Sequence, residues 1–413
     1  MPNIRKNLAV IGGGASGMAA AVAYMQGGGR DAVVIEAQQR IGRKLLSTGN
    51  GRCNITNAAI TSDSYRTDCP ERMKRIFADI WQDGVEGFFN NIGVPIFEER
   101  EGRMYPRSET ATSVLDMLRF ELARRGADIL TERRVTRITR KSGAWLLDCG
   151  EDTIEARAVI IACGSPANPQ LGGCDDSAEL AKQLGVSFDK RRPALCPLLC
   201  DSPVLPSLKG VRVHCNVSLF ADGRHIHTES GELQFNDGNL SGVCVFQLSA
   251  RLQCIKYREA YIYADLLPDM SRSAAEKALS LRRDTLGDLP LEDFLTGLLN
   301  KRVATAVLKN VKLSPLSRRA DTLSDDELSA ISKALKRLPF HICGVSGWKQ
   351  AQSAVGGIRL SVLSDRLAVS EKPGLFACGE AVNVNGDCGG FNLHWAWCSG
   401  ITAGRSALSY LSK

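Results

Sequence analysis

The residues most clearly spaced for chemistry are the glycines of the stretch GGGASG at positions 12–17, which follow a G-x-G-x-x-G pattern. Gly12 permits a tight turn, Gly14 lets the backbone approach a pyrophosphate, and Gly17 lets a helix pack closely on a strand. Ala15 and Ser16 lie where the free N–H groups of a helix N-terminus would bind phosphate. The spacing therefore predicts a loop that binds a dinucleotide.

The segments on either side supply the elements that must position this loop. Leu8–Ile11 is a short apolar run typical of a buried parallel strand, and the alanine-rich Met18–Tyr24 predicts a helix. Val33–Ile35 predicts a second strand, which ends at Glu36 with Ala37 beside it, where a carboxylate would accept hydrogen bonds from ribose hydroxyls. Together these elements predict a bound dinucleotide, and they do not decide between FAD and NAD.

Composition indicates a globular protein of more than one domain. The chain has 413 residues, of which 44% are hydrophobic, enough for two or three domains with a large core. No apolar run reaches the length of a membrane span. Met1–Lys6 is basic, but the apolar run after it is too short for a signal peptide. We therefore expect a cytoplasmic protein without a membrane span.

Charge and cysteine content exclude several kinds of site. The net charge of +7 suits anionic substrates, cofactor phosphates or RNA, yet it is below that of a dedicated nucleic-acid-binding protein. The 14 cysteines include no C-x-x-C pair, and a disulfide framework is not expected in a cytosolic chain of this length. The five histidines form no metal motif, so we predict no metal site.

A second stretch with the composition of a binding loop follows Glu36. Residues 41–57 are rich in glycine, small polar residues and cations, with little apolar periodicity. Backbone amides and side-chain donors converge in such a loop, and it comes directly after a dinucleotide fold. We therefore expect it to fold around the ligand.

The chain resembles a bacterial flavoprotein family, BaiN/RdsA, also called HI-type conserved flavoproteins and the aminoacetone oxidase family. Three segments carry the resemblance: GRKLLSTGNGRCNITN at 42–57, FEEREGRMYP at 97–106 and GGFNLHWAW at 389–397. It covers both ends of the dinucleotide-binding region well and the middle of the chain thinly. It implies an α/β fold, in which a Rossmann-like FAD-binding domain of the two-dinucleotide-binding flavoprotein type carries an inserted α+β domain.

The resemblance also implies residues that contact FAD. The loop would run along the flavin, and the helix that begins near Phe391 would aim its N-terminus at the pyrimidine end of the flavin, stabilising negative charge on the reduced ring. Beyond the glycine loop, Glu36 and Ala37, the expected contacts are Arg43, Lys44, Thr48, Gly49, Asn50, Arg52, Cys53, Asn54, Val135, Ala162, Gly164, Gly379, Glu380, Asp387, Gly390, Phe391, Asn392 and Leu393.

The order of patterns predicts a domain inserted into the FAD domain. We expect the first part of the FAD domain at 1–192, the insert at 193–339 and the second part of the FAD domain at 340–413. Alternating strands at 211–220 and 225–235 flank a hairpin turn, and helices are expected at 271–286, 291–308 and 324–338. This insert is expected to cover the flavin.

The resemblance implies that the reaction is a flavin-dependent reduction, in which the flavin does the redox chemistry. The sequence contains no evident nucleophile–base pair. Two activities assigned to the family reduce ring double bonds of 3-oxo-Δ4,6 bile acids, in bile acid 7-dehydroxylation, and uridine to dihydrouridine in 23S ribosomal RNA. In both, the C=C bond is conjugated to a carbonyl group. We therefore expect an ene-reductase that takes electrons from NADH or NADPH. Candidate proton donors are Tyr105, Asp237, Cys388 and His394, with Cys53 as a further candidate.

Three substrates stay open at this point. A steroid-like enone comes first, because the charge is modest and only 6% of residues are aromatic, whereas RNA needs a basic surface with stacking residues. Ribosomal RNA comes second, and oxidation of a small amine, which the older family label suggests, comes third. Relatives commonly carry Thr-His where Asn236 and Asp237 stand here, which weakens the case for a catalytic group at that point. The sequence does not indicate the oligomeric state.

Overall fold

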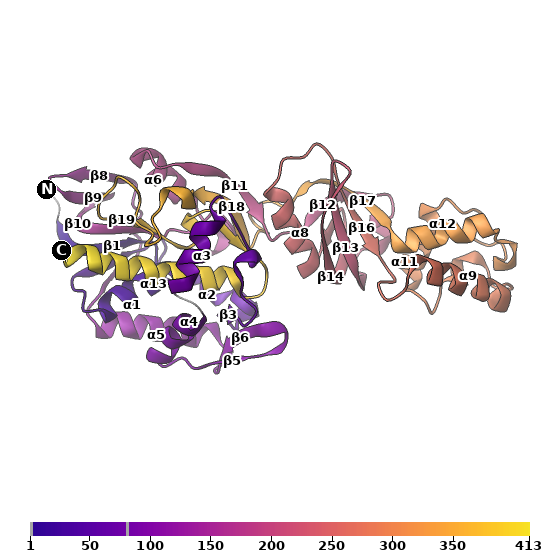
Figure 1. Cartoon of the computed structure of the whole chain (residues 1–413), viewed down its shortest axis with the longest axis horizontal. Coiled ribbons are helices and arrows are strands. Elements are labelled where there is room, and N and C mark those ends of the chain that lie inside the picture. Colours follow the sequence, from indigo (N-terminus) through magenta and orange to yellow (C-terminus); the bar gives the residue numbers. More distant parts are fainter. Residues whose placement is uncertain (1–2, 80–81) are drawn as a thin grey trace. The chain divides into compact units, whose positions relative to one another are not determined.

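The computed structural model describes residues 3–79 and 82–413, which form two compact units (Figure 1). Unit 1 comprises Met1–Pro193 and Ala351–Lys413, and unit 2 comprises Ala194–Gln350. The boundary predicted between 339 and 340 falls inside strand β17 (Leu338–Val345), which is hydrogen-bonded to two other strands of unit 2. Because paired strands belong to one unit, the chain returns to unit 1 only at Ala351.

Unit 1 is organised around a seven-stranded sheet in the order β7-β2-β1-β10-β9-β8, with β19 also paired to β10. Strands β7, β2, β1, β10 and β19 are parallel, and β10, β9 and β8 form an antiparallel extension. This sheet confirms the predicted α/β fold of the Rossmann type. The bounds are β1 Ile4–Ile11, β2 Ala32–Ile35, β7 Asp128–Leu130, β8 Arg137–Lys141, β9 Ala144–Cys149, β10 Asp152–Ile161 and β19 Leu375–Ala377.

Helix α13 (Phe391–Leu411) lies beside α1 (Ala15–Gln26), as Figure 1 shows in yellow and indigo. The two backbones approach closely: a Cβ atom at Gly400 would lie 2.4 Å from the carbonyl oxygen of Ser16, and one at Gly404 would lie 2.2 Å from that of Ala20. The last helix of the chain is thus packed against the helix that follows the glycine loop. The other helices of unit 1 are α2 Arg43–Leu46, α3 Pro70–Asp79, α4 Gln82–Asn91, α5 Ala111–Arg124 and α6 Asp176–Leu184.

Short strands connect the remaining parts of unit 1. The pair β20–β4 joins the segment before α13 to an early loop, and β3–β6–β5 joins the stretch 56–57 to 96–106. The bounds are β3 Thr56–Asn57, β4 Tyr65–Thr67, β5 Ile96–Glu98, β6 Arg103–Pro106, β11 Phe188–Ala194, β18 Ser353–Ile358 and β20 Val384–Gly386. The three segments that carry the family resemblance are therefore neighbours in space.

Unit 2 contains a closed barrel in the order β12-β15-β14-β13-β16-β17 and a group of helices. The predicted insert of mixed α and β structure is thus present, with β-strands that alternate between a buried and an exposed face. Its elements are β12 Leu198–Asp201, β13 Arg212–Ala221, β14 Arg224–Asn236, β15 Asn239–Ser241, β16 Ala260–Asp265, α7 Leu205–Leu208, α8 Val243–Gln253, α9 Arg272–Leu286, α10 Leu291–Phe294, α11 Lys301–Asn310 and α12 Asp325–Lys336.

Helix patterns in unit 2 were partly predictable. The predicted start of α12 is confirmed, because Ser324 and Glu327 form a capping box. In it, the side chain of each residue accepts a hydrogen bond from the backbone N–H of the other residue. The single helix predicted over 291–308 is wrong, since α10 and α11 are separate helices with a turn between them. Asn300 caps α11 there, by accepting a hydrogen bond from the N–H of Arg302 at 3.0 Å.

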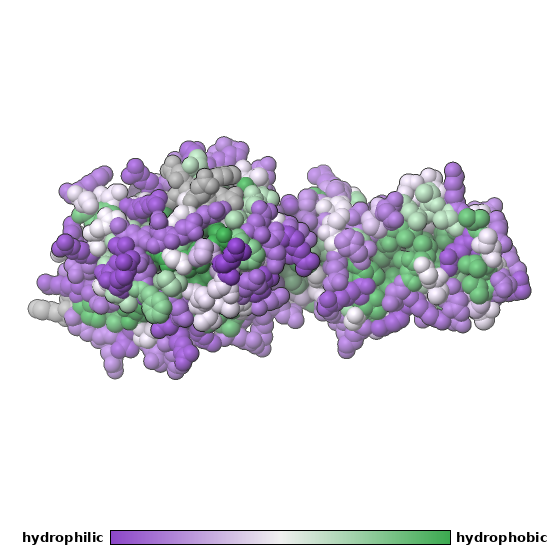
Figure 2. All heavy atoms as spheres, turned by 90° about the horizontal axis from the view of Figure 1, so that it is seen from below, coloured by the Kyte–Doolittle hydropathy of each residue, from purple (hydrophilic) through white to green (hydrophobic). Residues whose placement is uncertain are grey.

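The surface of the molecule is mostly hydrophilic on the face that Figure 2 shows, with hydrophobic residues gathered over part of unit 2. Among the described residues, no helix is both long enough and apolar enough to cross a membrane.

Candidate functional site

A cavity in unit 1 opens at the carboxyl ends of the parallel strands. Ile11 at the end of β1, Ile35 at the end of β2 and Ala162 directly after β10 all line it. Its empty space is about 1180 Å³, including the open mouth. Doubly wound sheets bind their ligands at this edge.

The glycine loop forms one wall of the cavity. Gly12 has a φ of +110°, and a Cβ atom there would lie 2.5 Å from the carbonyl oxygen of Ala162. A Cβ atom at Gly17 would lie 1.9 Å from the carbonyl oxygen of Gly12, whereas one at Gly14 would meet no atom within 4 Å. Two of the glycines are therefore required by the protein itself. Gly14 instead leaves open space in the cavity wall, which suits the close approach of a pyrophosphate.

Glu36 is fixed at the far end of the loop. Its Oε2 accepts a hydrogen bond from the backbone N–H of Gly13, and its Oε1 accepts one from that of Gln38, each at 2.8 Å. The carboxylate lines the cavity in this orientation. Because each carboxylate oxygen can accept a further hydrogen bond, the group can also receive ribose hydroxyls.

A half-buried ion pair forms another part of the wall. The Nζ of Lys44 lies 2.5 Å from Oε2 of Glu380, and the hydroxyl of Ser165 donates to the same oxygen at 2.9 Å. Burial acts to raise the pKa of Glu380, but Lys44 and Ser165 outweigh it and keep the pKa below its ordinary value. The carboxylate is therefore ionised at neutral pH.

The N-terminus of α13 closes the cavity. Asn392, Leu393 and Ala396 from its first two turns line the space. The side chain of Asn392 accepts from the N–H of Gly386 and donates to its carbonyl oxygen, both at 2.9 Å, so the start of the helix is tied to β20. The unpaired N–H groups of a helix N-terminus favour negative charge nearby.

Many of the residues predicted from sequence to contact the cofactor lie together in this cavity. Its lining includes Gly12, Gly14, Ala15, Ser16, Glu36, Ala37, Arg43, Lys44, Thr48, Val135, Ala162, Gly164, Glu380, Asn392 and Leu393. These residues come from segments more than 300 positions apart.

Other predicted contacts do not line the cavity. They are Gly17, Gly49, Asn50, Arg52, Cys53, Asn54, Gly379, Asp387, Gly390 and Phe391. Asn54 is buried, its Oδ1 has no hydrogen-bond partner among the described residues, and a Cβ atom at Gly390 would lie 3.0 Å from that oxygen. Cys53 is completely buried, and this burial raises the pKa of its thiol to about 12. Asp387 forms an ion pair with Arg66.

The four candidate proton donors are not brought together, and none lines the cavity. Tyr105 is nearly buried: its ring packs against Gly49, and the guanidinium of Arg52 lies 4.1 Å above the ring. Cys388 lies in the turn before α13. Asp237 belongs to unit 2, in the exposed turn between β14 and β15, with Lys209 at 3.7 Å.

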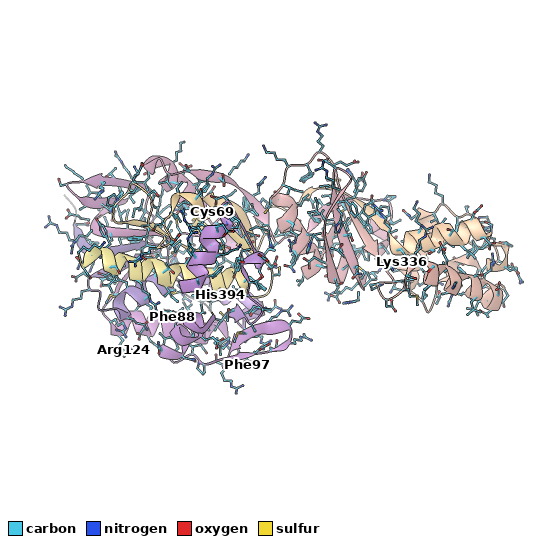
Figure 3. All side chains as sticks on the ribbon, in the orientation of Figure 1. Cys69, Phe88, Phe97, Arg124, Lys336 and His394 are labelled. Atoms are coloured by element: carbon cyan, nitrogen blue, oxygen red, sulfur yellow. The ribbon has the colours of Figure 1, made fainter. Side chains whose placement is uncertain are left out.

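His394 points into the interior of unit 1 from the first turns of α13 (Figure 3). Its Nδ1 lies 2.7 Å from the hydroxyl of Thr56, and its Nε2 lies 3.2 Å from the thiol of Cys398. Burial lowers its pKa to about 3, so the imidazole is neutral at physiological pH. Through its contact with Thr56, His394 attaches α13 to β3.

Sequence reasoning missed several residues of the cavity wall. Cys163 and Ser165 flank the predicted Gly164, and Gln352 comes from the segment that re-enters unit 1. In the sequence, Cys163 and Ser165 could have been found only because they are neighbours of the predicted contact Gly164. Nothing in the sequence pointed to Gln352. Other additions are Gln38, Arg40, Leu45, Arg133, Arg134, Leu171, Gly172, Gly173, Cys174, Asp176 and Ala396. No group of three or more His, Cys, Asp or Glu side chains that could bind a metal ion occurs within residues 3–79 and 82–413.

A family model described as "HI0933-like protein Rossmann domain" matches residues 6–406. The chain belongs to the HI0933-like family. The family resemblance stated from the three sequence motifs is thereby confirmed, and the protein is an FAD-dependent oxidoreductase.

Two curated proteins extend the comparison along the full chain. A 3-dehydro-bile acid delta(4,6)-reductase from Clostridium scindens is 32% identical over 406 residues, which cover 97% of this chain and 98% of that protein. A ribosomal RNA dihydrouridine synthase from Escherichia coli is 27% identical over 394 residues, which cover 94% of this chain and 95% of that protein.

Solved structures share the fold at low sequence identity. A 3-ketosteroid delta1-dehydrogenase from Sterolibacterium denitrificans has a TM-score of 0.53 and 12% identity, covering 99% of this chain and 100% of that one. The open form of a flavocytochrome c3 fumarate reductase has a TM-score of 0.50 and 16% identity, covering 100% of this chain and 79% of that one. These likenesses show the fold alone.

The cavity suits the cofactor of this family. The open space beside Gly14 leaves room for a pyrophosphate close to the backbone, and the fixed Glu36 carboxylate can accept hydrogen bonds from ribose hydroxyls. The N-terminus of α13, with Asn392 and Leu393 in the lining, presents unpaired backbone N–H groups from which a polar heterocycle can accept hydrogen bonds.

Proposed function

We propose that this oxidoreductase is an ene-reductase that reduces a C=C bond conjugated to a carbonyl group, and that its substrate is a 3-oxo-Δ4 or 3-oxo-Δ4,6 steroid of the bile-acid type. The observation that carries the proposal is the 32% identity, over nearly the whole of both chains, to the bile-acid reductase. That relative shares both units, so the likeness is not confined to the nucleotide-binding fold.

Residues of the cavity are proposed to hold FAD along its length. The N–H groups of the glycine loop would bind the pyrophosphate, Glu36 the ribose, and Lys44 with Glu380 the region between pyrophosphate and ring. When bound, the flavin supplies hydride to the β-carbon of the enone, and NADH or NADPH is the proposed source of electrons. The first residues of α13 would stabilise negative charge near the ring.

We propose Tyr105 as the group that supplies a proton to the α-carbon. The side chain does not line the cavity, but its ring packs on Gly49, the neighbour of the cavity residue Thr48, in the loop that the family places along the flavin. Its hydroxyl makes no hydrogen bond to another described residue. Arg52 covers one face of the ring and fixes its orientation. A positioned phenol is a general acid that enzymes use.

The experiment that tests the function is anaerobic reoxidation of the photoreduced holoenzyme. A 3-oxo-Δ4 bile acid and unmodified ribosomal RNA are added in separate anaerobic cuvettes while the flavin spectrum is recorded. In a third cuvette the oxidised holoenzyme is mixed anaerobically with a small amine, which would reduce the flavin of an amine oxidase, and oxygen is then admitted and peroxide measured. Rapid reoxidation by the steroid, with a saturated ring as product, is the expected result. Reduction of the flavin by the amine, with peroxide formed when oxygen is admitted and no reoxidation by the steroid or the RNA, would refute an ene-reductase.

The proton donor is tested with Tyr105→Phe and the matched control Tyr410→Phe, which removes a hydroxyl from the C-terminal end of α13. Tyr105→Phe should slow reoxidation by the enone about 100-fold, because general acids contribute roughly 10²–10⁴ in rate. It should leave photoreduction unchanged. Equal rates in the two variants would assign the proton to another group.

Uridine in 23S ribosomal RNA is the second candidate substrate. The 27% identity to the Escherichia coli synthase also spans nearly the whole chain, and uracil carries a C=C bond conjugated to a carbonyl, as the steroid does. Reoxidation by RNA alone, with dihydrouridine as product, would select this candidate.

A further inference from the structure

The guanidinium of Arg191 lies buried behind the wall of the cavity in unit 1. Arg191 belongs to β11, which pairs with β18 (Figure 1), and its side chain is only 1% exposed. It is not among the described residues that line the cavity. Burial lowers the pKa of the guanidinium from its ordinary value, but an arginine side chain keeps its proton in a folded protein. Unit 1 therefore contains a positive charge enclosed by protein.

Arg191 holds two segments of the cavity wall together. Its Nη2 donates to the carbonyl oxygen of Glu380 at 2.9 Å and to the hydroxyl of Ser177 at 2.7 Å. That hydroxyl in turn donates to the carbonyl oxygen of Gly164 at 3.3 Å. Glu380 follows β19 and Gly164 follows β10, its parallel neighbour, and both residues line the cavity. One buried side chain thus connects the carboxyl ends of two adjacent strands.

Both segments lie directly against the glycine loop. A Cβ atom at Gly379 would lie 2.2 Å from Oγ of Ser16, and one at Gly12 would lie 2.8 Å from Cα of Cys163. Arg191 contacts Glu380, the residue after Gly379. Its charge therefore lies close behind the loop that is proposed to bind the pyrophosphate of FAD.

The carboxylates around Arg191 leave much of its positive charge uncancelled. Lys44 lies 2.5 Å from Oε2 of Glu380 and neutralises that carboxylate. The carboxylate that faces the guanidinium belongs to Asp175, whose Oδ1 lies 3.2 Å from Nη1 of Arg191. The Asp175 side chain is 50% exposed, and water screens an exposed charge far more than a buried one. The field of the buried guanidinium therefore extends into the cavity.

The next acidic residue along the chain, Asp176, also has a partner. It lines the cavity, and its Oδ1 accepts a hydrogen bond from Nη1 of Arg134 at 2.6 Å. The two opposite charges of this pair largely cancel for any ligand farther away. Asp176 therefore does not offset the charge of Arg191.

We propose that Arg191 is a positioning residue for FAD. Its buried positive charge favours the phosphates of the cofactor from behind the cavity wall, and its guanidinium holds the segments of Glu380 and Gly164 that the cofactor would contact. A positive charge in a poorly screened site acts on phosphate without touching it. This role rests on the proposed place of FAD in the cavity, and it is independent of which substrate the flavin reduces.

The test is reconstitution of the full-length, FAD-free protein with FAD, followed by quenching of flavin fluorescence at low salt. Arg191→Met should weaken FAD binding at least tenfold, because a charge about 12 Å from another changes an equilibrium about tenfold at an effective dielectric constant of about 20. Arg191→Lys keeps the charge and should lose only about threefold, because an ammonium group lacks the guanidinium fork. The matched control Lys190→Met removes an exposed charge from the preceding position of β11 and should change nothing.

A variant of Asp175 tests the same charge with the opposite sign. Asp175 is the N-cap residue of α6, and asparagine is equally suited to that position. Asp175→Asn should strengthen FAD binding about threefold at low salt, because it removes the half-exposed carboxylate that opposes Arg191. The matched control Glu179→Gln removes an exposed negative charge from the next turn of α6 and should bind FAD as the wild type does. Damage to the fold would weaken binding, so a gain in affinity reports the charge.

The outcomes separate an electrostatic role from a purely structural one. Equal losses of FAD affinity in Arg191→Met and Arg191→Lys would overturn the proposal. An Asp175→Asn variant that binds FAD no more tightly than Glu179→Gln would also overturn it, and this result stays available if Arg191→Met does not fold. None of these measurements uses an enone, so the role of Arg191 and the proposed reaction succeed or fail separately.

Discussion

Replacing Glu36 with glutamine should weaken FAD binding sharply while leaving the fold intact. In the wild-type protein, the carboxylate accepts backbone hydrogen bonds from Gly13 and Gln38, each at 2.8 Å. A carboxamide has one acceptor oxygen, and its NH₂ group cannot accept, so one of these N–H groups loses its partner. These backbone bonds exist with and without FAD, so the affinity depends on the hydrogen bond from a ribose hydroxyl to the charged carboxylate, which a carboxamide held by one oxygen no longer accepts; such a bond contributes about 1.5–3 kcal/mol. The dissociation constant for FAD should therefore rise roughly 10-fold to 150-fold.

The assay is titration of the FAD-free protein with FAD, followed by quenching of flavin fluorescence. Glu98→Gln, at an exposed position on β5, makes the same chemical change away from the cavity and should bind FAD as the wild type does. The thermal midpoint of each FAD-free protein reports whether the fold has changed. An FAD affinity of Glu36→Gln within threefold of the wild type would refute the reasoning that this carboxylate organises the site.

Three further changes test other parts of unit 1. Gly14→Ala should keep the thermal midpoint and lose FAD affinity at least tenfold, because its methyl group meets only the cavity, whereas Gly17→Ala should unfold at a lower temperature because its Cβ would lie 1.9 Å from a carbonyl oxygen. Lys44→Met should lower the stability of the FAD-free protein by about 1–3 kcal/mol, measured by urea unfolding, and adding Glu380→Gln should restore part of it. His394 is neutral in the fold with a pKa of about 3, so its contribution is fully present above about pH 6.5 and is lost as the pH falls toward 3, by at most about 1.4 kcal/mol per pH unit. His394→Gln should flatten that part of the stability profile.

Controls distinguish these effects from general damage. His225→Gln makes the same substitution at an exposed position of unit 2 and is the matched control for the change in side chain. Equal pH dependence of the wild type and His394→Gln would show that the buried imidazole is not the group that titrates. A Lys44→Met, Glu380→Gln double variant no more stable than Lys44→Met would show that the Glu380 carboxylate is not what the lysine neutralises.

Local patterns predicted the nucleotide-binding half of the fold well. The buried runs at 8–11 and 33–35 and the glycine spacing each depend on neighbours within a few residues, so the strand, loop and helix could be predicted directly. The C-terminal segments were assigned by resemblance to a family rather than by periodicity. The return to unit 1 was misplaced, because β17 is an apolar strand whose partners in the barrel lie more than 70 residues earlier.

The proton donors show the limit of sequence more sharply. His394 has a residue type suited to acid catalysis and lies in a segment shared with the family. Only the packing of α13 against β3 shows that its imidazole is enclosed between Thr56 and Cys398. The adjacency of Phe220, Tyr261 and His341 was equally hidden, because these residues belong to three strands whose order in the barrel no local pattern predicts.

The sequence alone determined that the chain binds a dinucleotide, since the glycine spacing, the helix start and Glu36 act through backbone geometry that a few adjacent residues impose. Only the tertiary structure showed which residues, distant in the sequence, line the same cavity. Lys44 pairs with Glu380, more than 300 residues later in the sequence, and Gln352, which follows unit 2 in the sequence, lines the same cavity. The physical reason is that contacts within a turn of chain are fixed by local conformation, whereas contacts across a sheet depend on the order in which its strands pair.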